Sequence, residues 1–321
     1  MMKPLTLQRI GRIRNKWITD AMSEILCTFM LALFVYASGA QSILSHGEAS
    51  TVPGRALAAG AGLMIAVYCG INASGACVNP GITLMFCMTG KLPWKRYPVY
   101  VVCQFIGAFL AASLTFGVYN EMINTFDGGV RQVYGDQATV SIFTSFPSQD
   151  ISTGTGFFDI FVGCGLLTGC TCMLIDPNNA NAAPGVVPIA LALMLYGIIM
   201  GFGVQTGAPI NLSIDFSGRL FAFFAGYGAD VFRRDNYWFW VPPTACISGT
   251  ITFVTTYQLM IGNHLPDNNP STGGNSADST NCDDRVNGID GIHGQEKHKY
   301  SVNELNKDDQ WTLSNNIVTK I

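Results

Sequence analysis

The side chains that most often carry catalysis are scarce or badly placed along this chain. Its four histidines, His46, His264, His293 and His298, lie in connecting segments or near the C-terminus rather than inside the apolar runs. Enzyme active sites need several titratable groups that converge on one point, and no such constellation is visible. The sequence therefore predicts that the protein is not an enzyme.

The cysteines favour packing over disulfide or metal chemistry. The chain has ten cysteines. Seven of them fall inside long apolar runs, among them Cys164, Cys246 and the close pair Cys170 and Cys172. None has histidines at metal-ligand spacing. We therefore expect neither a metal site nor a disulfide framework.

Two asparagine-containing segments are the strongest chemical signal. Residues 74–81 read Ser-Gly-Ala-Cys-Val-Asn-Pro-Gly, and residues 206–213 read Thr-Gly-Ala-Pro-Ile-Asn-Leu-Ser. An Asn that begins a helix caps it with its side-chain oxygen and leaves its amide hydrogens as donors. Where two helix N-termini face one point, each contributes the equivalent of roughly half a positive charge there. Such a point repels cations and holds a neutral hydroxyl solute through Asn79 and Asn211.

Long apolar runs must position these two segments. The chain is 49% hydrophobic and only 12% charged, whereas soluble proteins carry about a quarter charged residues. A helix of roughly 20 apolar residues crosses the hydrocarbon core of a bilayer. Six runs are predicted to do so: 17–45, 56–73, 99–119, 157–175, 186–204 and 238–262.

The order of these runs indicates an inverted repeat. Each Asn segment closes one run and opens an apolar stretch, 82–88 or 214–224, that is too short to cross a bilayer. Three spans with a half-helix after the second therefore occur twice, so the two copies have opposite orientations. The predicted fold is an all-α membrane protein with six transmembrane helices and two re-entrant half-helices. Non-helical backbone at membrane depth is tolerated where it lines a wet cavity, so the Asn segments mark a pore.

Charge and composition divide the rest of the chain. Basic residues precede the first span and separate the second from the third: Lys3, Arg9, Arg12, Arg14, Lys16, Lys91, Lys95 and Arg96. The positive-inside rule then makes segment 1–16 cytoplasmic, and an even number of spans returns the C-terminus to that side. Repeat one covers about 17–119, an extracellular linker 120–156 and repeat two about 157–262. The polar tail 263–321 is predicted to be a disordered cytoplasmic segment.

The two Asn segments resemble the paired Asn-Pro-Ala boxes of the aquaporin superfamily. Asn79-Pro80-Gly81 is similar to the first box, and Asn211-Leu212-Ser213 is similar to the second. The resemblance covers residues 17–262. It extends to the glycerol-conducting, aquaglyceroporin branch through three further residues, Asp215, Arg219 and Pro242.

This resemblance implies a multi-pass protein of the plasma membrane with both termini cytoplasmic. It also implies a homotetramer with one pore per subunit. Each pore would pass glycerol, urea, other small neutral solutes and water passively, and would contribute to water and osmolyte balance. The resemblance also implies no cofactor, and no metal and no nucleic-acid partner is expected.

The second half of the chain departs from the family pattern. Leu212 stands where the family has proline, which removes a preset helical φ but no obligatory hydrogen bond. By resemblance, the narrow outer selectivity filter comprises Ala59, Ile199, Ala208 and Ile214. Ile214 takes the place of the family's filter arginine and cannot donate a hydrogen bond. The expected constriction is wide and apolar.

Glu24 is the one carboxylate predicted to lie well within the first span, where an unsatisfied charge is expensive. By resemblance it accepts hydrogen bonds from an Asn-box loop and holds that loop's carbonyl groups toward the pore. The matching position in the second repeat is Ile160, which follows Asp159. We therefore expect the second repeat to lack this carboxylate.

Two other functional classes fit parts of the pattern. A secondary transporter also has inverted repeats, but it needs intramembrane acids or sodium ligands, and only Glu24 qualifies. A non-conducting paralogue that regulates or scaffolds other subunits is suggested by the altered second half. The final residues, Thr319-Lys320-Ile321, match the C-terminal pattern that PDZ domains bind.

Overall fold

Six long α-helices and three short ones make up most of the described part of the chain. The structure is a computed structural model, and it describes residues 11–266. The long helices are α1 (Lys16–Leu44), α2 (Val52–Gly70), α4 (Tyr97–Asp127), α5 (Thr153–Leu174), α6 (Val187–Thr206) and α9 (Val241–Met260). The half-helices are α3 (Pro80–Met88) and α7 (Leu212–Ala222), and α8 (Asp230–Tyr237) follows α7. No strand occurs within residues 11–266. Of the predicted tail 263–321, residues 267–321, with the PDZ-type motif at Thr319–Ile321, lie outside the described residues.

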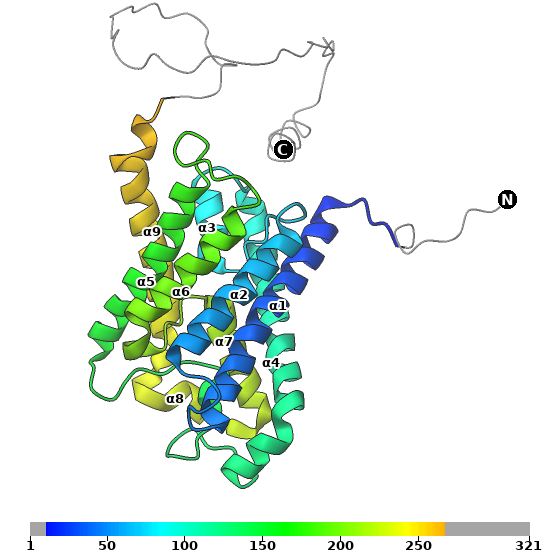
Figure 1. Ribbon diagram of the computed structural model, residues 1–321, viewed down its shortest axis with the longest axis vertical. Coiled ribbons are helices and arrows are strands. Elements are labelled where there is room, and N and C mark those ends of the chain that lie inside the picture. Colours follow the sequence, from blue (N-terminus) through cyan, green and yellow to red (C-terminus); the bar gives the residue numbers. More distant parts are fainter. Residues whose placement is uncertain (1–10, 267–321) are drawn as a thin grey trace, which may run out of the picture. The chain divides into compact units, whose positions relative to one another are not determined.

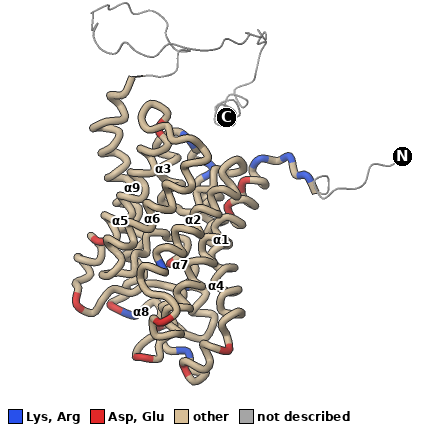
Figure 2. The backbone as a smooth tube through the Cα atoms, in the orientation of Figure 1, with Lys and Arg blue, Asp and Glu red and all other residues tan. Residues whose placement is uncertain are grey.

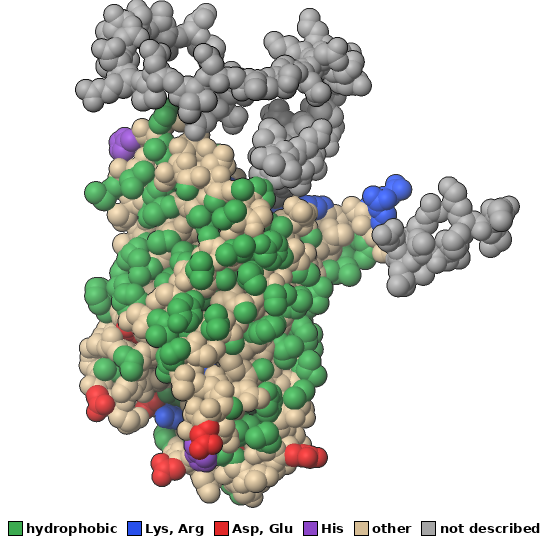
Figure 3. Space-filling model, viewed as in Figure 1, with side chains coloured by type: hydrophobic (Ala, Val, Ile, Leu, Met, Phe, Trp, Pro, Cys, Tyr) green, Lys and Arg blue, Asp and Glu red, His purple; other side chains and the backbone are tan. Residues whose placement is uncertain are grey.

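Five of the long helices are long and apolar enough to cross a membrane by length and composition alone. The sixth predicted span, α9, has a lower mean hydropathy because it contains Pro242, Pro243 and several threonines, although it carries no charged residue. Figure 3 shows apolar side chains over the flank of the helices on the face in view, as lipid contact requires. In Figure 2 the charged residues gather mainly toward the helix ends.

The packing of the helices follows the predicted repeat. α1 packs on α2 and α4 in the first half, and α5 packs on α6 and α9 in the second, while α2 and α6 join the halves. Each half-helix also packs on the last helix of the other half, α3 on α9 and α7 on α4. In Figure 1, α3 lies in the upper part of the bundle and α7 in the lower part. The two half-helices therefore enter from opposite ends, as an inverted repeat requires.

One close helix contact occurs in both halves. A Cβ atom on Gly107 of α4 would lie 2.3 Å from the Ile25 carbonyl oxygen of α1. A Cβ atom on Gly249 of α9 would lie 2.2 Å from the Phe161 carbonyl oxygen of α5. Only glycine allows backbones to approach this closely. Ile25 in the first repeat therefore corresponds to Phe161 in the second, and Glu24 corresponds to Ile160. The sequence comparison of the repeats gives the same correspondence.

The connection between the repeats is shorter than the expected linker, and part of it is buried. α4 continues to Asp127 and α5 begins at Thr153, so the helices extend into the expected linker 120–156 from both sides. A 3-10 turn over Val140–Ile142 places Val140, Ile142 and Phe143 in the hydrophobic core. The segment is therefore part of the packed structure around the second half-helix rather than a freely exposed loop.

Candidate functional site: paired asparagines at the half-helix starts

The two predicted asparagines lie at the starts of the two half-helices. Asn79 is the N-cap of α3, and its side-chain oxygen accepts a hydrogen bond from Gly81 N at 2.9 Å. Asn211 is the N-cap of α7, and its side-chain oxygen accepts from Ser213 N at 3.1 Å and Ser213 Oγ at 2.7 Å. Both Asn residues have extended backbone angles, as N-caps do. The caps fix the direction in which each amide nitrogen points.

Each amide nitrogen binds the loop of the opposite repeat. Asn79 Nδ2 donates to the carbonyl oxygen of Ile210 at 2.9 Å, and Asn211 Nδ2 donates to the carbonyl oxygen of Val78 at 2.8 Å. Val78 and Ile210 are the residues that directly precede the two asparagines. An amide has two N–H groups, so each side chain retains one donor beyond this reciprocal pair. Two half-helix N-termini and two such donors thus meet at one place.

The positions after the asparagines differ between the repeats. Pro80 occupies the first turn of α3, where its missing N–H costs no helix bond. Leu212 occupies the same place in α7, and α7 forms without the proline. The hydroxyl of Ser213 adds a second donor to the Asn211 oxygen, which Gly81 cannot do for Asn79. The proline is therefore replaced without loss of the cap.

Glu24 binds the first Asn loop. Its side chain is fully buried in α1, and its Oε1 accepts from Ser74 Oγ at 2.6 Å and from Cys77 N at 3.0 Å. Its Oε2 accepts from Val78 N at 3.0 Å and from Gln104 Nε2 at 2.7 Å. Two successive backbone N–H groups thus point at the carboxylate. Glu24 thus binds the N–H of Val78, and the carbonyl oxygen of Val78 accepts the hydrogen bond from Asn211 Nδ2.

The symmetry-matched position in the second repeat is Ile160, which is not a carboxylate, but a carboxylate one residue away makes one of the contacts that Glu24 makes. Asp159, one residue before the symmetry-matched Ile160, is buried and accepts from Thr206 Oγ1 at 2.7 Å and Gln205 Nε2 at 3.1 Å. Thr206 occupies the position of Ser74, so the contact to the loop's hydroxyl residue is retained. The backbone contacts are not retained, because Pro209, at the position of Cys77, has no N–H. The Ile210 N–H instead bonds to the Ala208 carbonyl at 2.8 Å.

The four predicted filter residues differ in how deeply they are buried. Ala59 and Ile214 are buried in one hydrophobic cluster, and half-buried Ile199 packs against that cluster. Ala208 is also half-buried, and its positive φ of 51° matches the φ of 48° at Ala76 in the first loop. The backbone carbonyl of Ile214 accepts from Tyr36 Oη at 2.6 Å. None of the four side chains can donate a hydrogen bond.

Asp215 and Arg219 bind the connection between the repeats. Asp215 Oδ1 accepts from Thr144 Oγ1 at 3.0 Å, Ser145 N at 2.8 Å and Ser145 Oγ at 2.7 Å. The buried Arg219 donates to the carbonyls of Ser145 at 2.7 Å and Val231 at 2.6 Å, and lies 3.6 Å from Asp215. Both side chains are buried, and Arg219 has no exposed surface. The pair therefore anchors the connection over α7 and does not substitute for a filter arginine.

Pro242 lies buried in the first turn of α9, just after the buried Trp238. A proline is favoured there because the first helical N–H groups have no partner within the helix. Pro242 therefore has a structural role, because it lies at the start of α9, the helix that packs on α5 and on the first half-helix, α3.

A cysteine pair behind the second Asn loop was not expected. Cys164 of α5 and Cys246 of α9 form a disulfide, with a Cα–Cα distance of 5.1 Å. Sequence could place both residues in spans but could not show that they face each other, because they are 82 residues apart. Seven further cysteines among the described residues are free.

An inverted repeat of membrane helices around two Asn-capped half-helices defines the aquaporin class of membrane channel. The chain belongs to the major intrinsic protein family, whose model matches residues 13–253.

Comparison with individual proteins agrees with this assignment. The chain is 32% identical to Aquaporin-10 of Homo sapiens over 80% of this chain and 85% of that protein. It is 34% identical to Probable aquaglyceroporin-2 of Gibberella zeae over 78% of this chain and 74% of that protein. The X-ray structure of the aquaglyceroporin from Plasmodium falciparum matches with a TM-score of 0.69, over 76% of this chain and 97% of that chain. At 24% identity, this last likeness shows the fold.

Proposed function

We propose that this protein is an aquaglyceroporin-like channel for the passive movement of glycerol, other small neutral solutes and water, and that it contributes to water and osmolyte balance. Membership of the major intrinsic protein family and relatives named as aquaglyceroporins support this function. We further propose a homotetramer in the plasma membrane with both termini cytoplasmic. The basic residues before α1 and between α3 and α4 support that orientation.

The reciprocal Asn pair is the observation that carries the proposal. Asn79 and Asn211 are fixed by their own caps and by the opposite loop, and each retains one amide hydrogen. Donors held in place compensate a hydroxyl solute for the water that it leaves behind, without reorganisation. The two half-helix N-termini disfavour cations at the same point. Neutral solutes are therefore selected over ions.

The test is stopped-flow glycerol flux into proteoliposomes that contain Asn79→Asp or Asn211→Asp. A carboxylate cannot donate to the opposite loop and puts negative charge at the half-helix start, so we expect flux to fall about tenfold. Asn124→Asp, on the exposed last turns of α4, serves as the matched control and should conduct like the parent. Parent-like flux in both pore variants would exclude a pore between these residues.

The filter residues support broad selectivity among neutral solutes. Ala59 and Ala208 are small, and Ile214 supplies no donor, so solute dehydration at the filter must be compensated by backbone carbonyls and retained water. We expect glycerol and urea to pass at similar rates. A parent protein that passes water and excludes glycerol would contradict this filter assignment.

A second candidate function is that of a non-conducting subunit that regulates or scaffolds other channels. Ile214 and Leu212, which replace the family's filter arginine and box proline, favour it. Flux in proteoliposomes that contain this chain alone decides between the two functions. Conduction of glycerol excludes the second candidate, and a purified protein that conducts neither glycerol, urea nor water supports it.

A further inference from the structure

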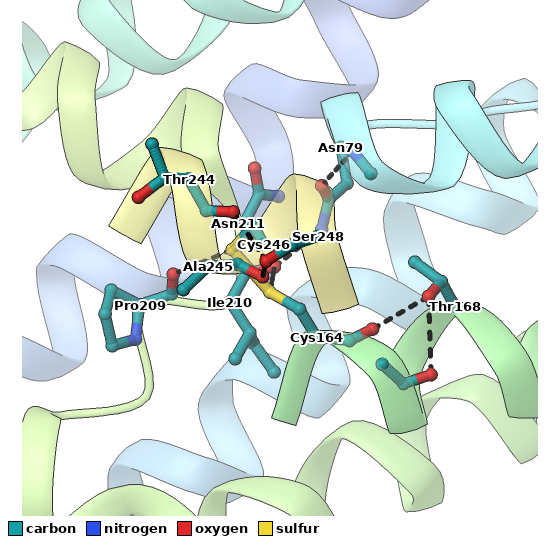
Figure 4. The surroundings of a disulfide bond; sticks show 12 residues. Asn79, Cys164, Thr168, Pro209, Ile210, Asn211, Thr244, Ala245, Cys246 and Ser248 are labelled. Carbon is teal, nitrogen blue, oxygen red and sulfur yellow. Dashed lines mark hydrogen bonds between the residues drawn. A yellow bond between two sulfur atoms is a disulfide. The ribbon is translucent and has the colours of Figure 1, made fainter. Parts of the chain in front are cut away.

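The Cys164–Cys246 pair lies directly behind the second Asn loop. Cys164 projects from α5 and Cys246 from α9, and both side chains are buried. Figure 4 shows the two sulfur atoms beside Pro209 and Ile210, on the segment that leads into Asn211. The pair thus joins two membrane helices at the depth of the proposed pore site.

Each sulfur contacts a carbonyl group of that loop. Cys164 Sγ lies 3.5 Å from the Ile210 oxygen, and Cys246 Sγ lies 3.5 Å from the Pro209 oxygen. Two sulfurs from different helices therefore face two successive carbonyls. A thiol can donate a weak hydrogen bond to such a carbonyl, whereas a disulfide sulfur has no hydrogen to donate. The hydrogen bonding of the loop consequently depends on the oxidation state of the pair.

The Ile210 carbonyl connects this chemistry to the pore. The same oxygen accepts the bond from Asn79 Nδ2 at 2.9 Å, which holds Asn79 in the reciprocal pair. In the disulfide state Asn79 is the one donor described for this oxygen, and a covalent bond holds α5 and α9 behind the loop. In the dithiol state the Cys164 thiol shares the oxygen with Asn79, and the covalent link is absent.

We propose that Cys164 and Cys246 are a site of reversible oxidation that controls how firmly the second Asn loop is held, and through it the rate of solute flux. The disulfide is the faster-conducting state, because it leaves the Asn79 bond intact and backs the loop with a covalent link. The effect on flux rests on the proposed channel function. The oxidation itself and its effect on the loop do not.

The redox chemistry requires a small uncharged oxidant and reductant, since the sulfurs are buried. With a hydroperoxide such as H2O2, one cysteine sulfur displaces water from the O–O bond to give a sulfenic acid. The second sulfur then displaces the remaining oxygen as water, so two thiols and one H2O2 give one disulfide and two waters. A small uncharged dithiol reverses the reaction. It gives up two electrons and two protons to the cysteines and leaves as its own cyclic disulfide.

Three measurements on the full-length protein in proteoliposomes test this inference. The first is the mass added by alkylation after denaturation, before and after treatment with dithiothreitol. We expect Cys164 and Cys246 to be unmodified in the peroxide-treated protein and both to be alkylated after reduction. If both are alkylated in the peroxide-treated protein, the pair does not form a disulfide and the proposal fails.

The second measurement is amide hydrogen exchange of the loop around residues 207–212. Loss of the covalent link should speed exchange of this loop about threefold on reduction. The variant Cys164→Ala with Cys246→Ala should show no response to either reagent. The matched control is Cys170→Ala with Cys172→Ala, which changes two other cysteines on α5 and should respond like the parent. Equal exchange in both redox states of the parent overturns the coupling to the loop.

The third measurement is glycerol flux, which we expect to fall about threefold when the parent is reduced and to recover on peroxide treatment. Flux that is unchanged although the loop loosens refutes control of conduction. If the parent conducts no glycerol in either state while alkylation and exchange behave as expected, the proposed channel function fails and the redox site stands.

Discussion

Replacement of Glu24 by Gln tests whether the carboxylate holds the first Asn loop. The wild-type side chain accepts four hydrogen bonds, two of them from Cys77 N and Val78 N. Whichever way the new amide points, its NH2 group faces one of these two backbone N–H groups. A buried donor without an acceptor costs about 1–3 kcal/mol, and the remaining bonds lose the strength that a charged acceptor gives. We expect Glu24→Gln to destabilise the protein by about 2–4 kcal/mol.

Asp159→Asn provides a matched comparison in the second repeat. Asp159 is also buried, but both of its partners are side chains, from Thr206 and Gln205. The Thr206 hydroxyl can turn and accept from the new amide, and no backbone N–H loses its acceptor. We therefore expect a cost of about 1 kcal/mol or less.

The assay for both variants is equilibrium unfolding in mixed detergent with rising dodecyl sulfate, together with glycerol flux. Glu24→Gln should shift the unfolding midpoint to lower denaturant and reduce flux, because the Val78 carbonyl that binds Asn211 is no longer fixed. Asp159→Asn should change both quantities much less. Equal effects of the two substitutions, or a larger effect of Asp159→Asn, would refute the argument that the backbone N–H groups carry the interaction.

Three further predictions concern the filter, helix packing and topology. Ile214→Arg should restore a donor to the filter and raise the ratio of glycerol to urea flux severalfold over the parent, measured in the same proteoliposomes; an unchanged ratio would remove Ile214 from the filter. Gly249→Ala places a methyl group against a carbonyl 2.2 Å away and should lower the yield of folded protein sharply, whereas Gly117→Ala, with open space around it, should not. An epitope tag in residues 128–149 should be reached by antibody on intact cells and one in residues 268–284 only after permeabilisation; the reverse pattern would contradict the charge-based orientation.

The repeat and its asparagines could be predicted because they depend on local patterns. The Asn segments recur with the same spacing, and each follows an apolar run whose length alone predicts a span. The buried stretch at Val140–Phe143 was missed because a short apolar run inside a polar connection gives no periodic signal. Its burial depends on contacts with α1 and α7 that only the folded chain brings together.

Two site features depend on tertiary contacts and could not be predicted from either repeat alone. Asp159 lies one residue from the symmetry-matched position, so an exact comparison of the repeats overlooks it. A shorter carboxylate one position earlier on the helix still reaches the hydroxyl of Thr206. The Cys164–Cys246 contact depends on how α5 and α9 are rotated toward each other, and an apolar span without a polar face gives little information on rotation.

The reciprocal bonds of Asn79 and Asn211 have a consequence for biosynthesis. When the first half of the chain leaves the ribosome, the side-chain amide of Asn79 has no acceptor, because Ile210, whose carbonyl accepts its hydrogen bond in the folded protein, has not yet been made. Until α7 arrives, the first half-helix has neither this acceptor nor the last helix of the second half, α9, against which it packs. The first loop therefore reaches its final position only after translation of the second repeat. A chain that ends before the second Asn segment therefore carries an amide at membrane depth without its protein acceptor.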